Sequence, residues 1–120
     1  MKIAITATGQ DLSAQVDPRF GRAAYILVVD TDTLDFDVID NAETRNAFKG
    51  AGIQAGAAVS DKGAQVLLTG YCGPNAFKTL EAAGVKVVND VSGTIQEAVD
   101  RFNTGAYAAY ASAPNTDGHW

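Results

Sequence analysis

Residues 64–77, AQVLLTGYCGPNAF, decide the fold because they combine a buried strand, a glycine-rich turn and the start of a helix. The apolar run at 64–69 is short, as in a strand that is covered on both faces. Asn75 is a helix-capping residue type, and apolar side chains then recur at helical spacing until Gly84. This stretch therefore predicts a strand, a loop that contains the only cysteine, and a helix over residues 75–83.

The rest of the chain predicts further elements by the same criteria. Residues 35–41 alternate with period two, which indicates a strand with one wet face, and a short turn joins them to the apolar run at 24–30. These two strands form a predicted hairpin. The predicted strands are residues 2–8, 24–30, 35–41, 64–69 and 85–88, and the predicted helices are residues 50–62, 75–83 and 94–103.

The element order favours an α/β fold with a mixed five-stranded sheet. Strand–helix–strand units imply right-handed parallel crossovers, which gives the strand order 3-2-1-4-5 with the second strand antiparallel and helices on both faces. The first helix would lie on the face opposite the second helix or flank the hairpin, and the sequence does not settle which. The predicted inward side chains are Ile53, Ala57 and Ala58 in the first helix, and Ile95, Ala98, Val99 and Phe102 in the third.

The composition is that of one globular domain. The 120 residues are 47% hydrophobic and 19% charged, and we expect the domain to span residues 1–112, with a flexible tail at 113–120. A net charge of -5 argues against nucleic-acid binding, and one cysteine allows neither an internal disulfide nor an iron–sulfur cage. No apolar run is long enough to span a membrane, and the first residues lack a signal-peptide layout, so a cytoplasmic protein is expected.

Several cationic residues are predicted to gather at one end of the sheet, where the first and fourth strands end. We call this end the upper edge. Open α/β sheets bind ligands there, and glycine-lined backbone N–H groups and a helix N-terminus favour anions. The alternative is that loops are simply polar and that these cations meet only solvent. The cations concerned are Arg19, Arg22, Arg45, Lys49 and Lys78.

Three segments carry a resemblance that covers nearly the whole chain. They are residues 16–23 (VDPRFGRA), 50–55 (GAGIQA) and 70–77 (GYCGPNAF). In this order they resemble the dinitrogenase iron–molybdenum cofactor biosynthesis domain family, and within it the members that carry a molybdenum–copper sulfide cluster. The resemblance implies a ribonuclease-H-like fold and a carrier of an anionic metal–sulfide cluster or an iron–molybdenum–sulfur precursor. Some members have histidines near the cluster, whereas the one histidine here is His119, in the tail.

The predicted binding site combines the cationic end with the loops of the resemblance. Guanidinium N–H groups of Arg19 and Arg22 would donate to sulfide or oxo edges, and Phe20 would form an apolar wall. Glycines 50, 52 and 56 are interpreted as permitting close helix packing rather than ligand approach. The predicted cofactor-binding residues are Arg19, Phe20, Gly21, Arg22, Arg45, Lys49, Tyr71, Cys72, Gly73, Asn75 and Lys78.

The sequence allows three interpretations of the role of Cys72. Its place before a helix N-terminus should favour the thiolate, which makes it a candidate metal ligand for copper or molybdenum. It could equally be a small loop residue whose backbone N–H is the useful group. A nucleophile of the cysteine-phosphatase type is disfavoured, because Pro74 lacks the N–H that such a loop needs and Lys78 lacks the planar fork of arginine.

Several enzyme classes lack their residues in this chain. The predicted strands at 2–8 and 64–69 carry no carboxylates for a two-metal nuclease, and there is neither a Walker-type loop nor a Ser/His/Asp set. The first hypothesis is therefore the one that the resemblance implies, a non-enzymatic cluster carrier, with a protein partner that loads or receives the cluster. The alternatives are a metal-free regulatory interaction module and a small phosphate- or nucleotide-binding domain.

Overall fold

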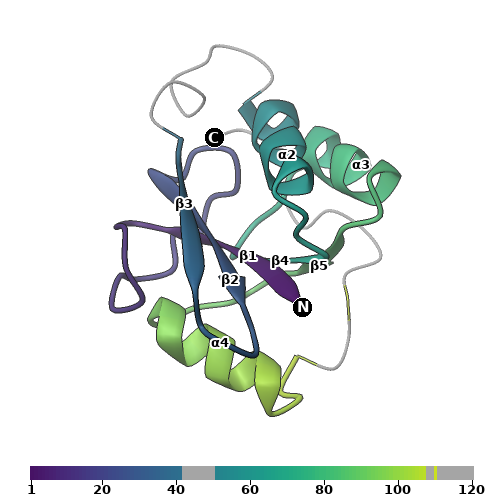
Figure 1. The fold of residues 1–120 in the computed structure, drawn as a ribbon. Helices are drawn as coiled ribbons and strands as arrows, with labels where there is room; N and C mark the ends of the chain where they lie inside the picture. Colours follow the sequence, from purple (N-terminus) through teal and green to yellow (C-terminus); the bar gives the residue numbers. More distant parts are fainter. Residues whose placement is uncertain (42–50, 108–109, 111–120) are drawn as a thin grey trace.

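The computed structural model describes residues 1–41, 51–107 and 110. In this part of the chain three consecutive strands come first, and helices and strands then alternate around one sheet (Figure 1). Their bounds agree with the predicted elements to within a few residues. The strands are β1 (Lys2–Ala7), β2 (Tyr25–Asp30), β3 (Phe36–Asp40), β4 (Val66–Leu68) and β5 (Lys86–Val88), and the helices are α2 (Ala51–Asp61), α3 (Pro74–Ala82) and α4 (Ile95–Asn103).

The sheet confirms the predicted topology. Its five strands have the order β3-β2-β1-β4-β5. β2 pairs antiparallel with both β1 and β3, whereas β1, β4 and β5 run parallel, with Ile5 opposite Leu68 and Leu68 opposite Val88. The carboxyl ends of the three parallel strands consequently meet at one edge, which is the predicted upper edge.

Helices cover both faces of this sheet, as predicted. α2 and α3 lie side by side on one face, and α4 covers the other (Figure 1). Side chains along β2 alternate between the two cores: Ile26 and Val28 belong to the α2/α3 side, and Leu27 and Val29 to the α4 side. The position of α2, which the sequence left open, is therefore beside α3 and not opposite it.

The inward face of α2 differs from the predicted one. Ile53 is 45% exposed and Ala57 is exposed, whereas Ala55 and Val59 are buried against the sheet. The predicted face was wrong because α2 packs on α3 through its glycines. A Cβ atom at position 52 would lie 2.8 Å from the Cβ atom of Ala76, so Gly52 permits a close approach of the two helices. The packing interpretation of Gly52 and Gly56 is thus confirmed, and Gly50 lies outside the described residues.

The helix ends explain where the chain turns toward the upper edge. α3 begins at Pro74, and its N-cap is Gly73 with no side-chain cap bond, so the prediction that Asn75 caps this helix was wrong. Proline at the first helical position fits, because the N–H of that position has no partner within the helix.

Within the described residues, no helix is both long and apolar enough to cross a membrane.

The third helix follows its prediction closely. α4 begins after Thr94, whose hydroxyl accepts the N–H of Glu97 while the Glu97 carboxylate accepts the N–H of Thr94, which is a complete capping box. Of the predicted inward side chains, Ile95, Ala98 and Val99 are buried. Phe102 is partly buried against the same core.

Candidate functional site

Two loops meet at the upper edge and form a short bridge. The backbone N–H of Tyr71 donates to the carbonyl of Pro18 at 2.6 Å, and the N–H of Phe20 donates to the carbonyl of Tyr71 at 3.1 Å. These bonds make a parallel bridge between residues 19 and 71. The loop that follows β4 is therefore held against the loop that precedes β2, although about 50 residues of chain separate them.

A buried pair of hydroxyl groups supports this bridge from below. Thr6 and Thr69 are both fully buried, and their Oγ1 atoms lie 2.9 Å apart. The Thr6 hydroxyl donates to the carbonyl of Asp17, so the shared proton between the two threonines comes from Thr69. The N–H of Asp17 donates back to the carbonyl of Thr6 at 2.9 Å. The loop containing Asp17 is thus tied to the ends of both β1 and β4.

The contact between Gly70 and Pro18 leaves no space for a side chain. A Cβ atom at position 70 would lie 2.7 Å from both the Cα and the carbonyl oxygen of Pro18. Because these neighbours are backbone atoms, they cannot move away without displacing the loop. Glycine at position 70 therefore sets how closely the two loops approach each other.

Arg19 extends from this bridge into solvent beside a buried carboxylate. The side chain of Arg19 is 43% exposed and that of Asp17 is 7% exposed. The Asp17 carboxylate accepts the backbone N–H of Arg19 at 3.1 Å, and its Oδ1 atom lies 3.8 Å from Nε of Arg19. The carboxylate therefore fixes the backbone of the loop, while the long ion-pair distance leaves the outer guanidinium N–H groups able to meet a ligand.

The next residues form a tight turn that is held by an amide. Gly21 has a φ angle of 92°, a left-handed conformation that favours glycine, and the N–H of Arg22 donates to the carbonyl of Arg19 at 3.3 Å. Nδ2 of Asn41, a buried residue after β3, donates to the carbonyls of Gly21 and Ala23 at 3.2 and 2.9 Å. The partly exposed side chain of Arg22 thus lies on the same tied loop as Arg19.

Cys72 is part of the core, which corrects the expectation of an exposed thiolate. Its side chain is fully buried in the cluster that contains Phe20, Ala76 and Phe77. Burial raises the pKa of the Cys72 thiol to about 12, because the surrounding apolar atoms disfavour the charged form. The thiol is therefore protonated at neutral pH, and the expected effect of the helix N-terminus does not outweigh desolvation.

The other predicted site residues are divided between core and surface. Phe20 is buried in the α2/α3 core and is not a pocket wall, whereas Tyr71 is 40% exposed. Lys78 is exposed, but it is the fifth residue of α3 and lies a turn below the start of the helix. Arg45 and Lys49 lie outside the described residues. The upper edge therefore brings together Arg19, Gly21, Arg22, Tyr71, Cys72 and Gly73, with Asn75 exposed on the first turn of α3.

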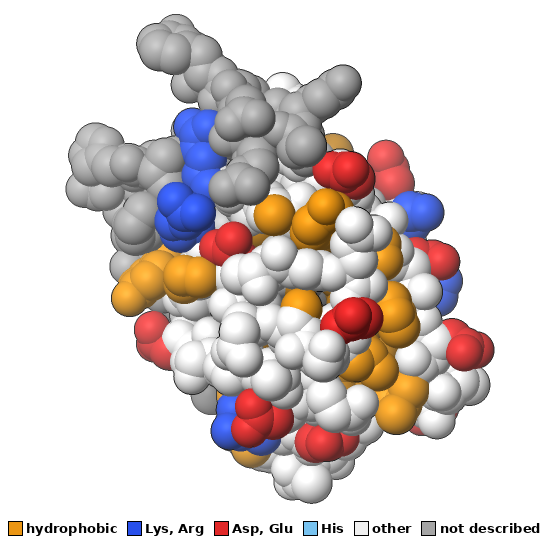
Figure 2. Space-filling model, turned by 90° about the vertical axis from the view of Figure 1, so that its left-hand side faces the viewer, with side chains coloured by type: hydrophobic (Ala, Val, Ile, Leu, Met, Phe, Trp, Pro, Cys, Tyr) orange, Lys and Arg blue, Asp and Glu red, His pale blue; other side chains and the backbone are white. Residues whose placement is uncertain are grey.

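The upper edge offers positively charged side chains and N–H donors. Among the described residues there is no group of three or more His, Cys, Asp or Glu side chains that could hold a metal ion. Figure 2 shows Lys and Arg side chains close together near the top of the face it presents. The N-terminus of α3 lacks a side-chain cap, so its first N–H groups add partial positive charge at the same edge.

Four residues that shape the site were missed by the sequence analysis: Thr6, Asp17, Asn41 and Thr69. Their common feature is that they are the buried polar or charged residues of the described chain. Thr6 and Thr69 come near the carboxyl ends of β1 and β4, and polar residues at such ends of otherwise apolar strands are a signal that could have identified them. Asn41 carries no comparable signal, because its partners are backbone carbonyls far away in sequence.

The fold and the bridged loops define a small α/β protein whose two bridged loops lie at the topological switch point of its sheet. Residues 1–105 match the family described as dinitrogenase iron-molybdenum cofactor, and the chain belongs to this family. The chain is 47% identical to the orange protein from Desulfovibrio gigas, whose structure was solved in the apo form, with a TM-score of 0.92 and 96% coverage of both chains.

Two further relatives extend the comparison. The chain is 40% identical to a Thermotoga protein that was proposed to be a NifB protein, with a TM-score of 0.75, covering 87% of this chain and 88% of that one. It is also 25% identical over 108 residues to an uncharacterized protein of Methanocaldococcus jannaschii, which covers 88% of this chain and 87% of the relative. These similarities agree with the strand order and helix arrangement described above.

Proposed function

We propose that this protein is a non-enzymatic carrier of an anionic metal–sulfide cluster, which binds at the upper edge between residues 17–22 and 70–73. The observation that carries the proposal is the bridge between residues 19 and 71, because it places the arginine loop and the glycine loop side by side. Membership of the cofactor family and the 47% identity to the orange protein support it. The cargo proposed is a molybdenum–copper sulfide cluster, with an iron–molybdenum–sulfur precursor as the alternative.

The residues of the edge suit an anion whose charge is spread over sulfide atoms. The guanidinium group of Arg19 offers several N–H donors in one plane and stays charged at all relevant pH values. Arg22 and the uncapped N-terminus of α3 add positive potential next to it. Binding by such groups is reversible and weakens with salt, which suits a protein that must also release its cargo to a partner.

Cys72 enters this proposal as a support of the loop and not as the anchor of the cluster. A buried, protonated thiol would have to lose its proton and leave the core before it could bind a metal. The backbone around it, from Gly70 to Gly73, is the part that faces the arginine loop. We therefore expect the cationic side chains to contribute more to affinity than the thiol does.

The test is a titration of the metal-free protein with tetrathiomolybdate and copper, followed by visible absorption. Saturable development of a new absorption band at a fixed stoichiometry is the expected result. Replacing Arg19 and Arg22 by Ala should weaken binding by at least about tenfold, since a hydrogen bond to a charged group contributes about 1.5–3 kcal/mol. Raising the salt concentration should weaken cluster binding by the wild-type protein more than cluster binding by the double variant.

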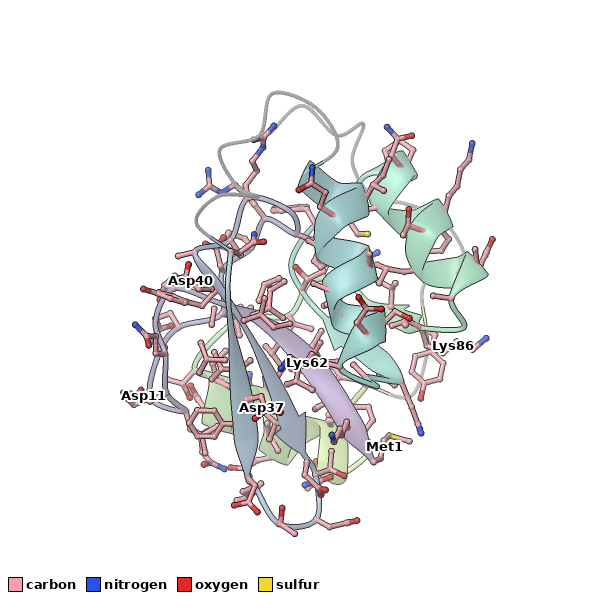
Figure 3. The ribbon with its side chains drawn as sticks, turned by 45° about the horizontal axis from the view of Figure 1, so that its top comes forward. Met1, Asp11, Asp37, Asp40, Lys62 and Lys86 are labelled. Carbon is pink, nitrogen blue, oxygen red and sulfur yellow. The ribbon has the colours of Figure 1, made fainter. Side chains whose placement is uncertain are left out.

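Matched controls separate a specific site from general attraction. Lys62→Ala together with Lys86→Ala removes the same charge at positions away from the upper edge (Figure 3), and this variant should bind like the wild type. Cys72→Ala should bind within about twofold of the wild type if the thiol is no ligand. A lack of saturable binding, or equal losses in the two double variants, would exclude the proposed site. Saturable binding of phosphate or a nucleotide in the same assay would favour the phosphate-binding alternative.

A further inference from the structure

The outer edge of β3 has backbone groups that β2 does not pair with. In the hairpin, the N–H of Asp30 donates to the carbonyl of Asp35, and the N–H of Asn41 donates to the carbonyl of Ala24. Hydrogen-bonded pairs alternate along an antiparallel ladder, so the N–H and C=O groups of Phe36 and Val38 point away from β2. Within the described part of the chain no strand pairs with this side of β3.

The same residues expose a row of apolar side chains. Leu34, Phe36 and Val38 are each 36% exposed. Phe36 and Val38 lie on one face because they are two residues apart in β3, and Leu34 lies in the turn that precedes β3. Phe36 lies opposite Val29, and Val38 opposite Leu27. The row thus continues the apolar surface of the α4 core beyond the edge of the sheet.

The turn before β3 exposes Leu34 in an unfavourable backbone conformation. Leu34 has a φ angle of 64°, a left-handed conformation that a residue with a side chain rarely adopts. The turn is fixed because the Asp30 carboxylate accepts the N–H groups of Asp32 and Thr33. An exposed leucine at such a position has no evident benefit for the isolated fold, since glycine or asparagine would fit the turn better.

The edge is also strongly acidic. Residues 23–44 contain no Lys, Arg or His, and the turn and strand from 30 to 40 carry five aspartates. Figure 3 shows Asp37 and Asp40 along β3, on the opposite side of the molecule from Lys86 on β5. The N-terminal amine lies 3.7 Å from the Asp32 carboxylate of this group. Figure 2 likewise shows hydrophobic side chains exposed among acidic ones.

We propose that β3 is a docking edge for an extended segment of another protein in which lysine or arginine alternates with aliphatic residues. Such a segment would add a strand to the sheet: its backbone would pair with Phe36 and Val38, its aliphatic side chains would cover the apolar row, and its cations would meet the aspartates. A second copy of this chain fits less well, because two acidic edges would face each other. The proposal is independent of the cluster site, which lies on the loops at the upper edge.

The test uses the full chain, labelled with ¹⁵N, and two synthetic peptides of about ten residues, the length of a long strand. In one peptide lysine alternates with valine, and in the other glutamate replaces every lysine. The lysine peptide should shift the amide signals of Phe36 and Val38 and slow their hydrogen exchange by about tenfold or more, since pairing removes these N–H groups from water. The glutamate peptide should do neither.

Two kinds of variant separate strand pairing from unspecific attraction. Val38→Pro removes one outward N–H group and should lower the affinity for the lysine peptide by about tenfold. Val38→Thr keeps that group and should lower the affinity by about threefold or less. Asp35→Asn with Asp37→Asn leaves the backbone intact and should reduce affinity and its salt dependence even if the proline variant does not fold. Equal binding of both peptides, signal changes confined to the upper edge, or binding unaffected by Val38→Pro in a folded protein would overturn the proposal.

Discussion

The two sides of the sheet are covered in different ways. On one side α2 and α3 pack against each other through Gly52 and Gly56, and the helix pair then covers the sheet. On the other side the single helix α4 buries Ile95 and Val99 directly against the strands. A helix pair needs small residues where its two axes approach, while a single helix needs large ones. The α2/α3 side also contains Cys72 and ends at the candidate site, so its packing positions the site.

The largest effect that we expect is a loss of unfolding free energy at high pH, which is caused by ionisation of Cys72 on the α2/α3 side. Its pKa is about 12 in the folded protein, against a usual value of 9.0. The folded state therefore favours the protonated thiol, so its contribution is fully present below pH 9 and is lost as the pH rises toward 12. Urea unfolding at pH 8, 10 and 11 should show a steeper loss of unfolding free energy in the wild type than in Cys72→Ala.

The Cys72→Ala variant is the control, since it differs from the wild type only in the loss of this thiol. An alkylating reagent at pH 8 provides a second readout. It should modify the folded protein at least about a hundredfold more slowly than the urea-unfolded chain, because the reagent has to wait for opening of the core. Equal rates would mean that the thiol is accessible, and Cys72 would again be a candidate ligand.

The inward face of α2 can be tested with two truncations on one helix. Val59→Ala removes fully buried methyl groups and should lower the unfolding free energy by about 2 kcal/mol. Ile53→Ala removes a larger side chain, but this side chain is 45% exposed and should cost less than about 0.5 kcal/mol. Both values come from denaturant unfolding, and the reverse order would restore the face predicted from sequence.

The close approach of the two helices can be tested with their glycines. Gly52→Ala should lower the unfolding free energy by about 1.5 kcal/mol, because the new Cβ would lie 2.8 Å from a rigid Ala76 Cβ and this overlap exceeds the gain in helix propensity. Gly56→Ala meets the Cγ2 atom of Thr79 at 3.0 Å, an atom that can rotate away. We expect its change to be near zero. A stabilised Gly52→Ala protein would contradict the close contact.

A smaller loss than those of Val59→Ala and Gly52→Ala is expected on the α4 side. Thr94→Ala removes the hydroxyl that caps α4 and should lower the unfolding free energy by about 1 kcal/mol, whereas Thr94→Ser should be nearly neutral. Calorimetric melting of the three proteins in parallel measures this difference. Identical melting of the alanine and serine variants would mean that packing alone specifies where α4 begins.

These differences explain what could be predicted from the sequence. The strand order followed from the apolar runs and crossovers, and the inward side chains of α4 followed from helical spacing. For α2 the same spacing argument chose Ile53, because an isoleucine normally marks a buried face. The actual face contains glycine and alanine, and small residues do not identify a face until the neighbouring helix is known.

The site was predicted less completely than the fold. The two loops could be placed at the upper edge from topology alone, and Arg19 lies there. The burial of Cys72 and Phe20 could not be predicted, because a loop between two glycines usually faces water. Whether a loop side chain turns inward depends on contacts such as that of Gly70 with Pro18, which join segments far apart in sequence.

For the proposed carrier, the hydroxyl pair of Thr6 and Thr69 beneath the bridged loops has a consequence for loading and release. A receptor whose backbone is already fixed loses little conformational entropy when its cargo arrives, so capture is governed by diffusion and by charge steering. The same rigidity denies the protein a hinge with which to expel the cargo. Handover then has to be driven by the greater affinity of the acceptor, and the carrier itself sets no timing.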